Sequence, residues 1–205
     1  MSSLCEDVER EVAAWGSACH QISEKCLLSG PYGGEINADS FIGLTQRSGK
    51  FEFVVDEEMA NTSQVYVDYC RERLSVYKGE TGEEAEFWVE KKLSLNALDP
   101  PLEAGGTGDF IAWFRLWKEL ELTDLKGGRG VTVDVVGNPQ GRSYAIGAIL
   151  SLPNIKPERV RVTIVQPRVG DGLPKSDEFH VSDLYDWTHD LLEHMVRAKQ
   201  ALVEF

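Results

Sequence analysis

The sequence predicts a single α/β domain in which helices flank a mixed central β-sheet. Segments with helical and with strand periodicity alternate along the chain, as they do in folds that pack helices on a sheet. A chain of 205 residues is long enough for one domain with a sizeable core. No internal repeat or flexible linker divides it, so we expect one domain over residues 1–205. Its expected parts are N-terminal helices over 5–80, a core over 84–168 and a C-terminal helix over 182–203.

The first predicted helix spans residues 5–28. Its apolar residues recur at alternating spacings of three and four, which is typical of an amphipathic helix. Gly16, His20 and Glu24 form a row at a spacing of four beside this apolar stripe. Residues four apart lie on the same side of a helix, so we expect the His20 and Glu24 side chains to be neighbours.

Two strands joined by a tight turn form the central feature of the predicted sheet. They span 107–114 and 119–126. The turn between them places Asp109 directly opposite Asp124, and directly opposed residues of an antiparallel pair share one face. Lys126 points the same way as Asp124, because side chains alternate along a strand. Like charges that face each other are destabilising, and a divalent cation between the two carboxylates would remove this penalty.

The remaining elements follow from periodicity and from residues that begin helices. A strand is expected around Glu90, to which we assign a structural role. Asn138 and Pro139 suit the start of a helix that carries Gln140 and Tyr144 one turn apart. The other predicted elements are a short extended segment over 50–55, a helix that begins near Asp56, strands over 87–95, 131–136 and 159–165, a loop over 169–177 and a C-terminal helix with Ser182 as its N-cap.

The composition predicts a cytoplasmic protein. No apolar run is long enough for a membrane span, and the acidic N-terminus lacks the apolar core of a signal peptide. The four cysteines show no C-x-x-C spacing, and we expect Cys19 and Cys26 to pack as small hydrophobic residues. The net charge of −13 argues against a surface that binds nucleic acid throughout, but it permits a local basic groove.

Four motifs occur in one order along the chain. They are Gly16-x-x-x-His20-x-x-x-Glu24, Gly106-x-Gly108-Asp109, Asp124-x-Lys126 and Gln140-x-x-x-Tyr144. With this order the chain resembles the PD-(D/E)xK nuclease superfamily, specifically its RecB-like exonuclease branch. It is also similar to a group of phage- and prophage-encoded RecB-like proteins of largely unassigned role. The resemblance covers residues 13–200 and implies a restriction-endonuclease-like core.

The resemblance and the chemistry of phosphodiester hydrolysis together imply a site for one or two Mg²⁺ or Mn²⁺ ions. The expected metal ligands are Asp109, Asp124, the backbone carbonyl of Leu125 and His20, whose imidazole would favour Mn²⁺. The other expected catalytic residues are Lys126, Gln140 and Tyr144, with Glu24 in support. Candidate contacts to the nucleic-acid backbone are Arg129, Arg142 and Arg168. Some RecB-like nucleases bind an iron–sulfur cluster, but all four cysteines lie in the first 70 residues, so we expect no such cluster.

The sequence therefore predicts a metal-dependent DNA nuclease, an exonuclease that acts in phage recombination or DNA processing in the cytoplasm of a bacterial host. Its expected partners are DNA and a phage recombination or annealing protein. Two alternatives stay open: a nuclease-fold protein without activity that serves as a binding or regulatory module for a recombination or defence partner, and an enzyme for a different phosphoester. Individual residues also have simpler interpretations, with His20 bonded to Glu24, Gln140 exposed, Tyr144 in the core and the three arginines solvated.

Overall fold

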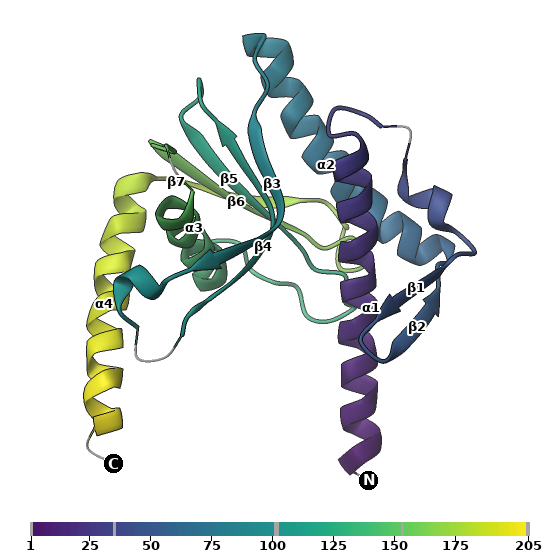
Figure 1. Ribbon diagram of the computed structural model, residues 1–205, viewed down its shortest axis with the longest axis horizontal. Coiled ribbons are helices and arrows are strands. Elements are labelled where there is room, and N and C mark those ends of the chain that lie inside the picture. Colours follow the sequence, from purple (N-terminus) through teal and green to yellow (C-terminus); the bar gives the residue numbers. More distant parts are fainter. Residues whose placement is uncertain (1, 35, 101–102, 153, 204–205) are drawn as a thin grey trace. The chain divides into compact units, whose positions relative to one another are not determined.

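The computed structural model describes residues 2–34, 36–100, 103–152 and 154–203 (Figure 1). It has a mixed α/β fold with a five-stranded mixed sheet flanked by helices, which confirms the predicted fold class at this level. The elements in chain order are α1 (Ser2–Ser29), the 3-10 helix η1 (Ala38–Phe41), β1 (Thr45–Ser48), β2 (Phe51–Val54), α2 (Glu57–Thr81), β3 (Glu86–Ser94), the 3-10 helix η2 (Asn96–Leu98), β4 (Gly105–Phe114), β5 (Glu119–Leu125), α3 (Pro139–Ser151), β6 (Arg159–Val165), β7 (Lys175–His180) and α4 (Val181–Val203).

The described residues group into two compact units. The first unit lies within residues 1–84, 125–133 and 164–175, and the second within 85–124, 134–163 and 176–205. Among the described residues, no helix combines the length and the apolar character needed to cross a membrane.

In the first unit, α1 and α2 pack against each other, and the β1–β2 hairpin contacts α1. The predicted first helix is confirmed; among its side chains whose burial is described, Val12 is 53% exposed and full burial begins at Ala18. α2 begins where expected: the Asp56 side chain accepts a hydrogen bond from the Met59 N–H (2.8 Å). The extended segment predicted over 50–55 contains β2, whose partner β1 was not predicted.

The described cysteine side chains of the first unit are buried thiols. Cys19, Cys26 and Cys70 are buried, and none of the three is in a disulfide. Burial raises the pKa of the Cys19 thiol to about 12 and also raises the pKa of Cys26. Cys19 is therefore protonated at neutral pH. The prediction that Cys19 and Cys26 pack as small hydrophobic residues is confirmed.

The sheet has the strand order β3-β4-β5-β6-β7. β4 is antiparallel to both β3 and β5. β5 and β6 run parallel: the Lys118 carbonyl accepts from the Arg159 N–H (3.1 Å), and further along both strands the Lys126 N–H donates to the Val165 carbonyl (2.9 Å). In the second unit α3 packs on β3 and β4, and α4 packs on α3.

The β4–β5 hairpin has the predicted register. Its turn closes within residues 115–118, and its ladder ends with Phe110 opposite Thr123. If the same register continues by one residue, Asp124 lies across from Asp109. The predicted register is confirmed, and the ladder stops one residue before the Asp109–Asp124 pair.

The strand predicted over 131–136 is wrong. These residues form turns and irregular backbone, and Val131 and Val136 are 88% and 71% exposed. The side chain of Gln166 takes the place of a neighbouring strand: it accepts from the Val133 N–H (3.1 Å) and donates to the Val131 carbonyl (3.2 Å). Alternating valines alone could not form a strand, because in the described part of the chain this segment bonds to the Gln166 side chain and pairs with no strand.

Two further predictions near the C-terminus need correction. The loop predicted over 169–177 ends early, because β7 begins at Lys175 and occupies the edge of the sheet. Ser182 is not the N-cap, since α4 begins at Val181. The Ser182 N–H instead donates to Nδ1 of His180 (3.2 Å), so His180 satisfies an amide at the start of α4.

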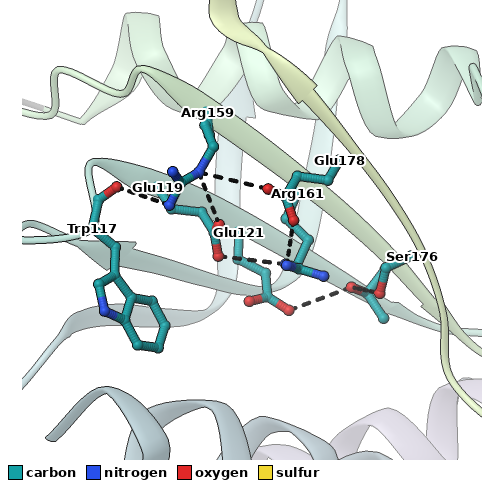
Figure 2. A network of polar contacts seen from close by, with 8 residues as sticks. Trp117, Glu119, Glu121, Arg159, Arg161, Ser176 and Glu178 are labelled. Carbon is teal, nitrogen blue, oxygen red and sulfur yellow. Dashed lines mark hydrogen bonds and ion pairs between the residues drawn. The ribbon is translucent and has the colours of Figure 1, made fainter. Parts of the chain in front are cut away.

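A network of charged side chains lies on β5, β6 and β7 in the second unit (Figure 2). Its centre is Glu119, whose side chain is 3% exposed. The Nε atoms of Arg159 and Arg161 lie 3.6 and 3.4 Å from its carboxylate oxygens. Both arginines also pair with Glu178 on β7. Glu119 is therefore a buried carboxylate with two cationic partners, as a buried charge requires.

The same network extends to neutral groups. Glu121 is fully buried and accepts a hydrogen bond from the Thr163 hydroxyl (3.3 Å). That hydroxyl also shares a hydrogen bond with the Ser176 hydroxyl (2.9 Å). Alternate residues on three neighbouring strands thus place polar side chains on one face of the sheet, as Figure 2 shows.

Candidate active site

Asp109, the first residue of the predicted site, lies across from Glu90. The β3–β4 ladder pairs Val89 with Phe110 and Lys91 with Gly108, which leaves Glu90 opposite Asp109. Carboxylate oxygens of the two side chains lie within 4.8 Å of each other, and both residues are half-buried. Two like charges so close together repel each other unless a proton or a cation lies between them.

The backbone at Glu90 is unusual. Its φ is +48°, in the left-handed region that residues with a side chain seldom adopt. Such conformations cost of order 1–3 kcal/mol and cluster at functional sites. We predicted a structural role for Glu90, and its position beside Asp109 instead makes it a candidate ligand.

Asp124 and Lys126 lie at the end of β5. Asp124 is half-buried and follows Thr123, the last ladder partner of β4. The close carboxylate group among the described residues contains Glu90 and Asp109 but not Asp124. Lys126 is half-buried, and its amide is held by the Val165 carbonyl of β6. The Asp124-x-Lys126 motif thus ends a strand beside the one that carries Asp109.

Within the first unit, the residue after Lys126 contacts α1. A Cβ added to Gly127 would lie 3.3 Å from the Cα of Gly16 and 3.8 Å from the Cβ of Cys19. This close approach explains why glycine suits position 127. It brings the segment after Lys126 against the turn of α1 that precedes His20. His20 and Glu24 are both half-buried.

Gln140 and Tyr144 form a pair at the start of α3. Asn138 caps this helix as predicted, because its side chain accepts from the Gly141 N–H (2.9 Å). The Gln140 amide donates to the Tyr144 hydroxyl (3.1 Å). A Cβ added to Gly106 would lie 2.6 Å from that hydroxyl oxygen, so the tyrosine ring lies directly on the Gly106 backbone. Tyr144 therefore stands at the β4 segment that leads to Asp109.

The three arginines predicted to contact DNA have different surroundings. The guanidinium of Arg142 is half-buried and lies over the Phe179 ring, 5.0 Å from its centroid, so it takes part in packing. Arg129 and Arg168 both donate to the Glu58 carboxylate in the first unit. Hydrogen bonds from Arg129, with the charge of Arg168, lower the pKa of Glu58, and Glu58 raises the pKa of Arg129.

The comparison with protein families covers nearly the whole chain. Residues 1–204 match the model of a family described as "Protein of unknown function (DUF2800)". The chain belongs to the DUF2800 family. No solved structure matches it. The family description names no activity, so the resemblance of this DUF2800 protein to nucleases stays a prediction from its sequence motifs.

The oxygen donors of this DUF2800 protein fit a hard divalent cation. Mg²⁺, Mn²⁺ and Ca²⁺ bind carboxylate oxygens at about 2.0–2.6 Å, so two oxygens on one ion lie no more than about 5 Å apart. The Glu90 and Asp109 oxygens, within 4.8 Å of each other, meet this condition. The acidic pair could therefore bind a metal.

Sequence reasoning missed Glu90 as part of this group. The β4–β5 register follows from a tight turn, whereas β3 and β4 are joined by the much longer segment 95–104. No local signal sets the pairing across such a connection. The one usable signal was the position of Glu90 near the centre of the strand that precedes the Gly106-x-Gly108-Asp109 motif.

Proposed function

We propose that this protein is a metal-dependent DNA nuclease, using Mg²⁺ or Mn²⁺, that hydrolyses phosphodiester bonds as an exonuclease in phage recombination or DNA processing. The observation that carries the proposal is the pair of carboxylates formed by Glu90 and Asp109, within 4.8 Å of each other on adjacent strands. The Asp124-x-Lys126 motif on the next strand supports it. This arrangement supports the proposal of a PD-(D/E)xK core, which comes from the sequence motifs.

In this proposal Asp109, Glu90 and Asp124 hold the cation with their carboxylates. When bound, the cation supplies an activated nucleophile and neutralises charge that develops on the phosphate. Lys126 adds a positive charge, which stabilises the same developing charge from the protein side. The Leu125 carbonyl, next to both residues in the chain, remains a candidate ligand from the resemblance.

Tyr144 would contact the phosphate as a hydrogen-bond donor. Its hydroxyl oxygen already accepts from Gln140, which leaves the hydroxyl proton to point to another acceptor. Contact with the Gly106 backbone fixes the ring near Asp109 in the chain. Gln140 is therefore a positioning residue for Tyr144.

The proposed roles of His20 and Glu24 come from the sequence resemblance. We propose His20 as a further metal ligand and Glu24 as a residue that orients it. A His20→Ala variant that keeps its fold should lose more activity with Mn²⁺ than with Mg²⁺, because imidazole binds Mn²⁺ better than Mg²⁺. An equal loss with both metals would argue for a positioning role.

The decisive experiment is digestion of linear single- and double-stranded DNA with Mg²⁺ or Mn²⁺. We expect the wild-type protein to degrade DNA, and Asp109→Ala and Asp124→Ala to lose at least about a hundredfold in rate, since each removes a ligand that supports several kcal/mol of charge stabilisation. Glu86→Gln is the matched control, because Glu86 is an exposed carboxylate on the same strand as Glu90. Folded wild-type protein without activity under any of these conditions would contradict the proposal.

A Glu90→Gln variant tests the part of the proposal that depends on the structure. If Glu90 is a ligand, we expect a loss of about a hundredfold, comparable with Asp109→Ala. If its role is only structural, Glu90→Gln should resemble Glu86→Gln. Calorimetric titration with Mn²⁺ gives a second measurement, in which Glu90→Gln should weaken binding.

A binding or regulatory module without nuclease activity is the second candidate function. The observations that favour it are the net charge of −13 and the pairing of Arg129 and Arg168 with Glu58 instead of with solvent. In that case the Asp109→Ala variant should still bind its recombination or defence partner while the wild type shows no cleavage.

A further inference from the structure

Two arginines converge on one carboxylate in the first unit. Glu58 Oε1 accepts hydrogen bonds from Nε of Arg129 (3.2 Å) and from Nε of Arg168 (3.1 Å), and a shorter one from Nη2 of Arg129. The two arginines come from segments that are far apart in the sequence. An oxyanion bound by two guanidinium groups is the arrangement by which proteins recognise phosphate as well as carboxylate.

Arg168 is held in place by contacts other than Glu58. Its guanidinium lies over the Trp15 ring, 3.9 Å from the centroid, and its Nη1 donates to the Gly127 carbonyl (2.9 Å). Its side chain is only 14% exposed. Arg168 would therefore keep its position if Glu58 moved away.

Glu58 and Arg129, by contrast, are open to solvent. Their side chains are 42% and 66% exposed. Glu58 lies in the first turn of α2, where the helix dipole favours an anion. Exposed ion pairs are weak because water and salt screen them, so another anion can displace this carboxylate.

We propose that Arg129 and Arg168 form a seat for a backbone phosphate of DNA, and that Glu58 occupies this seat in the free protein. When DNA binds, a phosphate takes the place of the Glu58 carboxylate, which turns to solvent. Within the first unit, the Arg168 bond to Gly127, the residue after Lys126, connects the seat to the segment that follows Lys126. The choice of DNA as the ligand rests on the proposed function. Within that function, the Glu58 carboxylate competes with a DNA phosphate for the two arginines.

The test is DNA binding without metal. Fluorescence anisotropy with a fluorescein-labelled single-stranded oligonucleotide and with its duplex, in EDTA, keeps metal-dependent cleavage out of the measurement. We expect Glu58→Gln to bind about two- to fivefold more tightly than wild type, the range that follows from the strength of exposed ion pairs. Glu57→Gln is the matched control, since it is an exposed neighbour with the same change in charge, and it should stay within about 1.5-fold of wild type.

The arginines supply the second half of the test. Arg168→Ala and Arg129→Ala should each weaken binding, and in the Arg129→Ala/Arg168→Ala double variant the further change Glu58→Gln should bring no gain. Circular dichroism and thermal melting show whether each variant is folded.

Three results would overturn the inference. One is a Glu58→Gln variant that binds no more tightly than Glu57→Gln, another is a gain that persists without the arginines, and the third is that neither wild type nor Glu58→Gln binds either DNA. These outcomes are separate from those of the nuclease assay. If the protein shows no nuclease activity but the variants bind DNA as expected, the phosphate seat stands. If the protein cleaves DNA but the variants do not bind as expected, only the phosphate seat is overturned.

Discussion

Glu119 and Glu58 are each held by two arginines, yet their surroundings differ. Glu119 is 3% exposed, on a central strand of the sheet, and its partners Arg159 and Arg161 lie on the next strand. Glu58 is 42% exposed at the start of a helix, and its partners come from irregular segments of the chain. Both groups consist of one carboxylate and two arginines. They differ in burial and in the backbone that carries them, so we attribute their different roles to these two properties.

The difference follows from desolvation. A carboxylate taken out of water loses several kcal/mol of hydration, and it needs its arginines in order to be charged in the folded state at all. An exposed carboxylate keeps most of its hydration and gains little from the same partners. The network in Figure 2 should therefore contribute to folding, while the Glu58 group can exchange partners and serve binding.

The largest expected effect is in the buried network. Arg161→Met removes the charge that pairs with Glu119 and Glu178, and so takes one of two arginines away from the buried Glu119 carboxylate. We expect a loss of about 3 kcal/mol in the free energy of unfolding, measured by urea denaturation. Arg159→Met is the control and should cost less than half as much, because Arg159 is more exposed and more distant from Glu119. Equal, small losses in the free energy of unfolding for both variants would mean that burial does not make the Glu119 group more important for stability than the Glu58 group.

We expect a smaller loss of stability from a change at Thr163, an uncharged residue of the network. Thr163→Val keeps the shape of a fully buried side chain but removes the hydroxyl that contacts Glu121 and Ser176. We expect a loss of about 1–2 kcal/mol, since the buried Glu121 carboxylate loses one hydrogen-bond donor. Ser176→Ala should cost less than Thr163→Val, because Ser176 does not contact Glu121 directly in the hydrogen bonds described. A Thr163→Val variant with the stability of wild type would contradict a stabilising role for the Thr163 hydroxyl.

The elements set by local chemistry could be predicted from the sequence. Asp56 and Asn138 begin helices through side-chain caps, and a tight turn sets the β4–β5 register. In each case the determining contacts lie within a few residues of one another, so the sequence contains the whole cause.

The parts decided by distant contacts could not be predicted. Glu90 meets Asp109 only because of the β3–β4 pairing. The segment over 131–136 has strand-like valines but lies beside the Gln166 side chain, and β7 is an edge strand with little apolar alternation. The Glu58 group joins three segments of the chain, and no spacing in the sequence indicates it.

The exposed group should contribute little to stability. Glu58→Gln removes the carboxylate that Arg129 and Arg168 share. We expect its urea midpoint to lie close to that of wild type and far from that of Arg161→Met, because solvent screens the exposed ion pairs. A loss of stability comparable with that of Arg161→Met would make the Glu58 group a structural element and would weaken the case for exchange with a phosphate.

The smallest expected effect is in the titration of Glu58 itself. Hydrogen bonds from Arg129, together with the charge of Arg168, hold its pKa below the ordinary value of 4.5. Because folding favours the ionised form, the contribution is complete above that ordinary value and is lost as pH falls through the lowered pKa. Carbon-detected NMR of the Glu58 carboxyl should show the lowered pKa, and Arg129→Ala should move it back toward 4.5. Added DNA in EDTA should also raise it, since a phosphate that occupies the seat separates Glu58 from its arginines, whereas a pKa unchanged by DNA would mean that Glu58 keeps its partners in the complex.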